Sequence, residues 1–226
     1  ILTNADVPTE KALEIIKTEQ FDCILSDHTM PLMDGVEFLK RAYDLYPRTM
    51  RLLVTAYSDV KILIDPFISN NPACDVPVEE LNPDIILLTH GHSDHFGDAL
   101  EISNSTNAPI ACIHEISLFL AKQGIRNISV NIGGSFIFRN IKFTMLEAKH
   151  SSEIDMVEET VPGGIAASFL ITFEDGTKIY HCGDTGLFGD MKDIVGAIYK
   201  PDIVMVPIGD KFTMGPFEAA LGTMWM

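Results

Sequence analysis

The residues with the most evident chemistry are three histidines and a carboxylate within six consecutive positions, in the string THGHSDH at residues 89–95. The string follows an apolar stretch, residues 84–88, that is expected to be a strand. His90 and His92 can turn toward one ion, while Asp94 and His95 can face a second ion nearby. Packing these four side chains without metal would leave several buried polar groups unpaired. The spacing therefore predicts a transition-metal site.

This string resembles the signature of the metallo-β-lactamase superfamily, and three other strings extend the resemblance over residues 61–217. AKHSS at 148–152 contributes His150, HCGDTG at 181–186 contributes Asp184, and ILIDPF at 62–67 contributes Asp65. GDTGLFGDM at 183–191 and PIGDKFTMGP at 207–216 are similar to the branch of metal-dependent hydrolases that includes relatives of L-ascorbate-6-phosphate lactonase.

The resemblance implies two sets of metal ligands. They are His90, His92 and His150 for one ion, and Asp94, His95 and Asp184 for the other. Asp94 is also the candidate catalytic residue, which orients the attacking water and moves its proton. Asp65 and His181 are expected to support the ligands from behind, although a packed strand-end histidine is the alternative for His181. Nitrogen and carboxylate donors favour two zinc ions, with manganese or iron as alternatives.

The predicted activity follows from these ligands. A pair of divalent ions makes hydroxide available near neutral pH and polarises the bond to be cleaved. We expect a metal-dependent hydrolase that acts on a small, anionic ester, lactone or phosphoester. The family continues past residues 215–220 to a final strand and a last histidine ligand. The chain stops at Met226 without one, so the second ion is expected to have fewer ligands and to bind more weakly.

Two further strings, DHTMPLMDG at residues 27–35 and VTAY at 54–57, together resemble the receiver domain of response regulators. The resemblance implies that Asp27 accepts a phosphoryl group and that Thr55 contacts it. The family's acidic pair would lie before Ile1, and its lysine does not follow residue 60. Phosphoryl transfer needs such charges, so Asp27 is expected to be a lone carboxylate. A signalling module phosphorylated at Asp27 and a catalytically inactive fusion are the alternatives.

The elements that must position these residues alternate between strands and helices, which is typical of the α/β class. The resemblances divide the chain into a partial, flavodoxin-like receiver segment at 1–60 and a hydrolase domain at 61–226. The hydrolase domain is expected to be an αββα sandwich, incomplete at both ends. Its strands are expected at 61–64, 84–88, 109–113, 135–138, 141–146, 165–173, 178–181 and 202–207, and its helices at 98–105, 115–123 and 190–199.

Composition limits the partners of the chain. The 226 residues carry a net charge of −16, which repels nucleic acid and anionic lipid. No apolar run approaches the ~18 residues of a membrane span, and residues 1–6 show no signal peptide. The four cysteines are widely spaced and are expected to be reduced. We therefore expect a cytoplasmic protein with a small-molecule substrate, and leave homo-oligomerisation open.

Overall fold

The computed structural model of the chain describes residues 9–18, 23–27, 37–38, 40–42, 50–54, 60–74, 76–155 and 159–226. The chain divides into two compact units, Ile1–Asp59 and Val60–Met226, and each is described by itself. Within the described residues, every helix is too short or too polar to cross a membrane.

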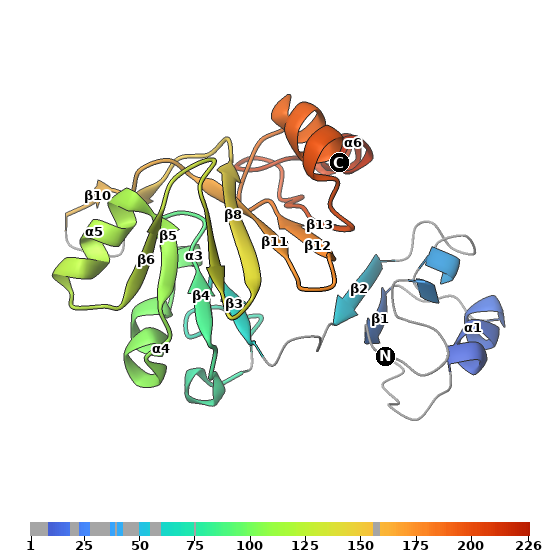
Figure 1. The fold of residues 1–226 in the computed structure, drawn as a ribbon, viewed down its shortest axis with the longest axis horizontal. Coiled ribbons are helices and arrows are strands. Elements are labelled where there is room, and N and C mark those ends of the chain that lie inside the picture. Colours follow the sequence, from blue (N-terminus) through green and yellow to red (C-terminus); the bar gives the residue numbers. More distant parts are fainter. Residues whose placement is uncertain are drawn as a thin grey trace. The chain divides into compact units, whose positions relative to one another are not determined.

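The first unit contains two parallel strands and helical segments (Figure 1). Helix α1 spans Thr9–Thr18, and strands β1 (Cys23–Asp27) and β2 (Met50–Val54) pair in parallel. Between the strands, residues 37–38 and 40–42 are helical, and Phe38 and Ala42 are buried one turn apart. A helical connection is what parallel strands require. This βαβ arrangement agrees with the predicted receiver-like pattern.

The second unit begins with a four-stranded parallel sheet in the order β3-β4-β5-β6. Its strands are β3 (Ile62–Ile64), β4 (Ile85–Leu87), β5 (Ile110–Ile113) and β6 (Asn127–Val130). Strands β4 and β5 are apolar at nearly every position because both of their faces are buried. Helices α4 (Ala99–Thr106) and α5 (His114–Lys122) cover one face of this sheet (Figure 1). The sequence analysis does not predict β6, whose apolar residues alternate with Asn127 and Ser129.

A five-stranded sheet packs against the other face, in the order β13-β12-β11-β8-β7. Its strands are β7 (Ser135–Phe138), β8 (Ile141–Glu147), β11 (Ala167–Thr172), β12 (Lys178–His181) and β13 (Ile203–Met205). Pairing is antiparallel except between β12 and β13. Successive strand residues face opposite sides: Phe143 and Met145 join the core between the sheets, whereas Leu146 and Leu170 join a second cluster on the outer face.

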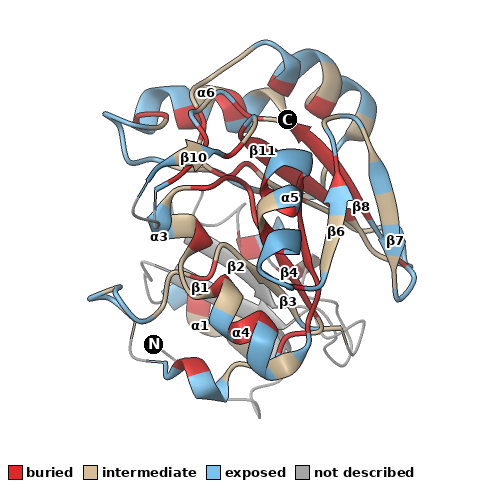
Figure 2. Cartoon of the chain, turned by 90° about the vertical axis from the view of Figure 1, so that its left-hand side faces the viewer, coloured by how far each residue is buried: buried red, intermediate tan, exposed pale blue. Residues whose placement is uncertain are grey.

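The outer layer over the five-stranded sheet consists of η2, a π-helix at Met191–Tyr199, and α6 (Pro216–Trp225). The structure thus has the predicted αββα layers, with the most buried residues along the strands (Figure 2). The sequence analysis expects a helix at 190–199, and the structure has one there, but it is a π-helix. The spacing of the apolar residues did not indicate this difference. The remaining short elements are η1 (Val78–Glu80), α3 (Ser93–Phe96), β9 (Glu153–Ile154) and β10 (Val161–Pro162).

Candidate metal centre

The candidate site residues lie just beyond the carboxyl ends of four strands, which are β3, β4, β8 and β12, and Asp65 follows the first of them. The loop after β4 carries His90 and His92 and leads into α3, which carries His95. Strand β8 of the facing sheet leads to His150, and β12 leads to Asp184. The polar loops therefore gather at one edge of the sandwich, where α/β proteins commonly place their ligands.

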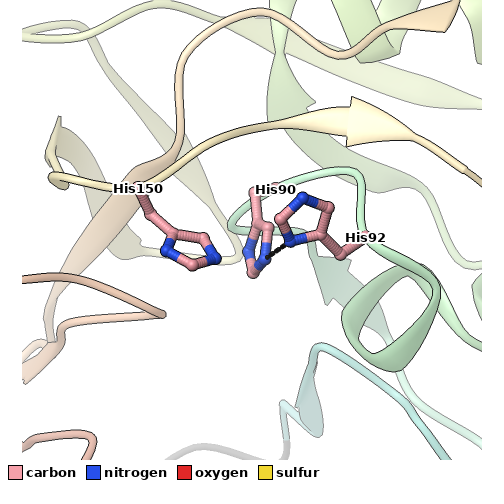
Figure 3. A group of neighbouring side chains, drawn as sticks. All are labelled: His90, His92 and His150. Atoms are coloured by element: carbon pink, nitrogen blue, oxygen red, sulfur yellow. Dashed lines mark hydrogen bonds between the residues drawn. The ribbon is translucent and has the colours of Figure 1, made fainter. Parts of the chain in front are cut away.

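Three imidazoles converge at this edge (Figure 3). Nε2 of His90 lies 3.0 Å from Nδ1 of His92, and the ring of His150 lies 5.1 Å from each of the other two rings. One nitrogen from each of the three residues lies within 4.8 Å of the others. Burial, together with the charge of His95, lowers the pKa of His90 to about 3. His90 is therefore neutral and offers a lone pair.

Asp184 connects this trio to His95. Its Oδ2 lies 3.4 Å from Nε2 of His95 and 3.8 Å from Nε2 of His150. Burial alone would lower the pKa of His95, but hydrogen bonds to Asp184 and Asp65 outweigh burial and raise this pKa to about 10. Burial alone would raise the pKa of Asp184, but His95 and its neighbouring imidazoles lower it. The carboxylate therefore faces both groups of imidazoles in its ionised form.

Asp65, at the end of β3, supports two histidines. It adopts a φ of 47°, and its Oδ1 accepts a hydrogen bond from the backbone N–H of Thr89 at 2.8 Å. Its Oδ2 accepts the Thr89 hydroxyl at 2.7 Å and lies 2.9 Å from Nδ1 of His95. The Thr89 Oγ1 in turn lies 2.9 Å from Nδ1 of His90.

Asp65 also lies close enough to His90 and His95 to share an ion with them. Because its oxygens already meet three donors, however, the geometry favours a supporting position over direct ligation. This is the position that the sequence analysis expects for it.

The loops that carry His150 and Asp184 are tied together by Thr185, which is fully buried. Its Oγ1 accepts a hydrogen bond from the backbone N–H of Lys149 at 2.9 Å and donates to the carbonyl of Gly186 at 2.8 Å. Next to Asp184, Gly183 has a φ of 61°, and a Cβ there would lie 2.9 Å from the carbonyl of Ala167. The positive φ and the close approach of Ala167 and of the Thr89 side chain therefore require glycine at this position.

The remaining sequence-predicted residues lie at the border of the cluster or outside it. Asp94 is exposed, with Oδ2 3.9 Å from Nε2 of His95. His181 is close enough that Asp65, His95 and Asp184 affect its pKa, which burial lowers. Its Nδ1 accepts a hydrogen bond from the backbone N–H of Gly183 at 3.2 Å. Asp27 ends β1 in the other unit; its side chain, with Thr55, lies outside the described residues.

Sequence reasoning missed the hydroxyl groups that hold the site together. Thr89 and Thr185 contact the candidate ligands or their loops, and Ser151 Oγ lies 3.3 Å from Nε2 of His92. All three residues adjoin a candidate ligand in the sequence, and this adjacency was the only available signal. Spacing alone does not indicate which way a serine or threonine side chain points.

The donor set fits a divalent transition metal. A buried neutral imidazole and two further imidazoles offer nitrogens within 4.8 Å of one another, and the ionised carboxylate of Asp184 lies 3.8 Å from Nε2 of His150. Nitrogen and carboxylate donors are the ligands of zinc and related ions in hydrolytic sites. The residues present therefore satisfy the chemistry that the H-x-H-x-D-H string predicts.

Comparison with known proteins places this geometry in context. The Beta-lactamase superfamily domain matches residues 60–224, and the Response regulator receiver domain matches residues 5–67. A UPF0173 metal-dependent hydrolase of Methanobrevibacter smithii is 75% identical over 167 residues, covering 74% of this chain and 70% of that protein. A second one, from Methanosphaera stadtmanae, is 57% identical, covering 73% of this chain and 71% of that protein.

A solved structure is also similar. Igni18, described as a novel metallo hydrolase from the hyperthermophilic archaeon Ignicoccus hospitalis, superimposes with a TM-score of 0.64 at 37% identity. The match covers 73% of this chain and 70% of that chain. The two relatives and this solved structure therefore each match 73–74% of this chain.

Proposed function

Because the chain belongs to the Beta-lactamase superfamily and, within it, to the UPF0173 metal-dependent hydrolases, we propose that residues 61–226 hydrolyse a small substrate with metal-activated water. The observation that carries the proposal is the position of Asp184. Its Oδ2 lies 3.4 Å from His95 and 3.8 Å from His150, so one carboxylate oxygen faces two groups of imidazoles. This placement suits a carboxylate shared by two ions.

Under this proposal the metal ligands are those expected from the sequence. His90, His92 and His150 hold one ion, and Asp94, His95 and Asp184 hold the other. Zinc is the preferred metal, with manganese or iron as alternatives. When bound, such ions supply a water whose pKa falls from ~15.7 toward ~7 and a charge that polarises the substrate oxygen.

The residues of the chain perform the remaining tasks. Asp65 and Thr89 fix the ring orientations of His90 and His95 through the hydrogen bonds described above. Asp94, with 63% of its side chain exposed beside His95, is placed to orient the attacking water and to carry a proton toward the leaving group. An exposed carboxylate can exchange that proton with solvent.

We propose a small, anionic ester, lactone or phosphoester as the substrate class. The chain has a net charge of −16, so the bound cations would be the main local attraction for a negative group. The same acidic surface disfavours nucleic acid as a substrate.

We also propose that the chain comprises two domains, 1–60 and 61–226. The division of the structure after Asp59 and the start of the Beta-lactamase superfamily match at residue 60 support a boundary here. The hydrolase function is proposed for the second domain alone.

Hydrolysis by the metal-loaded chain tests the proposal. A generic phosphodiester, an activated carboxylic ester and a γ-lactone represent the three substrate classes. We expect turnover of at least one of them, loss of turnover with a chelator, and recovery with added metal. His92→Ala should remove both metal and turnover, whereas His114→Ala, an exposed histidine paired with Ser129, should change neither. Unchanged turnover in His92→Ala would refute the proposal.

A further inference from the structure

The two ring nitrogens of His92 have different surroundings. Nδ1 lies 3.0 Å from Nε2 of His90, within the imidazole trio (Figure 3). Nε2, on the opposite edge of the ring, lies 3.3 Å from Oγ of Ser151 and 3.6 Å from Oε2 of Glu153. A neutral imidazole that offers one nitrogen to a metal carries its proton on the other. Nδ1 therefore faces the metal position, and Nε2–H faces a hydroxyl and a carboxylate.

Two other histidines of the cluster have a comparable partner behind the ring. Nδ1 of His90 contacts Thr89, and Nδ1 of His95 contacts Asp65. Thr89 belongs to the loop after β4 that carries His90 and His92, here called the metal loop, and Asp65 directly follows β3. The partners of His92 come from a different part of the chain, the segment after His150.

That segment is fixed against the metal loop. The backbone N–H of Gly91 donates to Oγ of Ser152 at 3.3 Å, and Ser152 donates to the carbonyl of Gly163 at 3.0 Å. A Cβ on Gly91 would lie only 2.6 Å from the carbonyl oxygen of Glu153. The backbone at residues 151–153 is thus held close to His92, and its side chains need little reorganisation to keep their contacts.

We propose that Ser151 and Glu153 are positioning residues for His92. The Ser151 hydroxyl accepts the hydrogen bond from Nε2–H, and the Glu153 carboxylate adds negative charge behind the ring. Together they hold Nδ1 toward the metal and make it a better donor, as carboxylates behind ligating histidines do. The inference rests on the proposed metal site, and it assigns roles to two residues outside the predicted ligand set.

The two residues should contribute unequally. Ser151 is within hydrogen-bond distance, whereas Glu153 lies farther away and 46% of its side chain is exposed to solvent. Water screens such a charge. Ser151→Ala should therefore weaken metal binding more than Glu153→Ala, and the double variant should lose about 10–100-fold in affinity for the first equivalent of zinc.

A competition titration with a chromophoric chelator measures that affinity in the full chain. The matched control is Asp155→Ala, because Asp155 is an exposed carboxylate on the same segment; its affinity should equal that of the wild type. Ser151→Thr restores a hydroxyl and should recover most of the loss. Recovery by Ser151→Thr would distinguish positioning from general damage to the loop.

Long-range proton–nitrogen NMR of the zinc-loaded protein gives a second readout, since it distinguishes the metal-bound nitrogen of His92 from the protonated one. We expect bound Nδ1 and protonated Nε2 in the wild type, with a mixture in the double variant. Wild-type affinity in the double variant, or zinc on Nε2, would overturn this inference while leaving the proposed function intact. A wild-type protein that bound none of zinc, manganese and iron would overturn both.

Discussion

The carboxylate of Asp65 holds the imidazole of His95, with Oδ2 at 2.9 Å from Nδ1, although the two residues are separated by 30 positions in the chain. The same carboxylate reaches His90 indirectly, because the Thr89 hydroxyl donates to Asp65 and lies 2.9 Å from Nδ1 of His90. One side chain at the end of β3 thus orients two candidate ligands. Both rings present their Nε2 atoms to the centre.

Asp65→Asn should weaken metal binding by about 10–100-fold. The amide has one acceptor oxygen for three donors, and its NH₂ group would face donors instead of acceptors. Metal affinity by chelator competition measures the effect. Asp84→Asn is a matched control, because Asp84 also accepts a backbone N–H, that of Lys61, at 2.8 Å but lies outside the metal cluster. Equal affinities for the two variants would contradict the role of Asp65.

Thr185→Val should destabilise the second unit by about 1–3 kcal/mol, the cost of leaving a buried polar group unpaired. Valine matches threonine in shape but cannot accept the hydrogen bond from Lys149 N–H. Urea unfolding of metal-free protein measures this loss, and Thr185→Ser, which keeps the hydroxyl, should lose less. Because Lys149 precedes His150 and Thr185 follows Asp184, metal affinity should fall together with stability. A valine variant as stable as the wild type would show that the tie between the two loops contributes nothing.

Asp98 gives the second unit a pH-dependent contribution to stability. Its Oδ2 accepts the backbone N–H groups of Ile68 and Ser69 at 2.8 and 2.9 Å. Burial alone would raise the pKa of Asp98, but these hydrogen bonds outweigh it and lower the pKa below its ordinary value. Because the pKa of Asp98 is lower in the folded state than in the unfolded state, its contribution to stability is fully present above the unfolded-state pKa. The contribution disappears as the pH falls through the folded-state pKa.

The wild type should therefore be more stable than Asp98→Asn at pH 7 by about 1 kcal/mol, the difference between hydrogen bonds to a charged and to a neutral acceptor, because the asparagine amide keeps an acceptor oxygen. The difference should shrink as the pH falls below about 4. Urea unfolding of both proteins between pH 3 and pH 7, at about 0.1 M salt, follows the difference. A gap that stayed constant over this range would show that ionisation of Asp98 is not its source.

Much of the fold could be predicted because its periodicities are simple. The expected strands at residues 84–88, 109–113 and 141–146 correspond to β4, β5 and β8. Strand β6 was missed because Asn127 and Ser129 interrupt its apolar residues. The sequence pattern does not show the close approach of η2 to the end of α6, where a Cβ on Gly196 would lie 1.9 Å from the carbonyl oxygen of Trp225.

The histidines and aspartates of the candidate site could be named from the sequence. The string at residues 89–95 identified four donors, and its resemblance to a known family added His150, Asp184 and Asp65 from distant strings. The hydroxyl partners Thr89, Ser151 and Thr185 were missed, because a hydroxyl is recognised by the direction of its hydrogen bonds and not by spacing. The contact of Glu153 with His92 also required the three-dimensional path of the segment after β8.

The position of the metal itself tests the account most directly. A crystal structure of the zinc-loaded chain, with anomalous diffraction recorded on both sides of the zinc absorption edge, would locate the ion independently of any assumed ligand. The account predicts an anomalous peak about 2.0–2.1 Å from Nε2 of His90, Nδ1 of His92 and Nε2 of His150. A fully occupied zinc bound elsewhere, with these three nitrogens left uncoordinated, would contradict it.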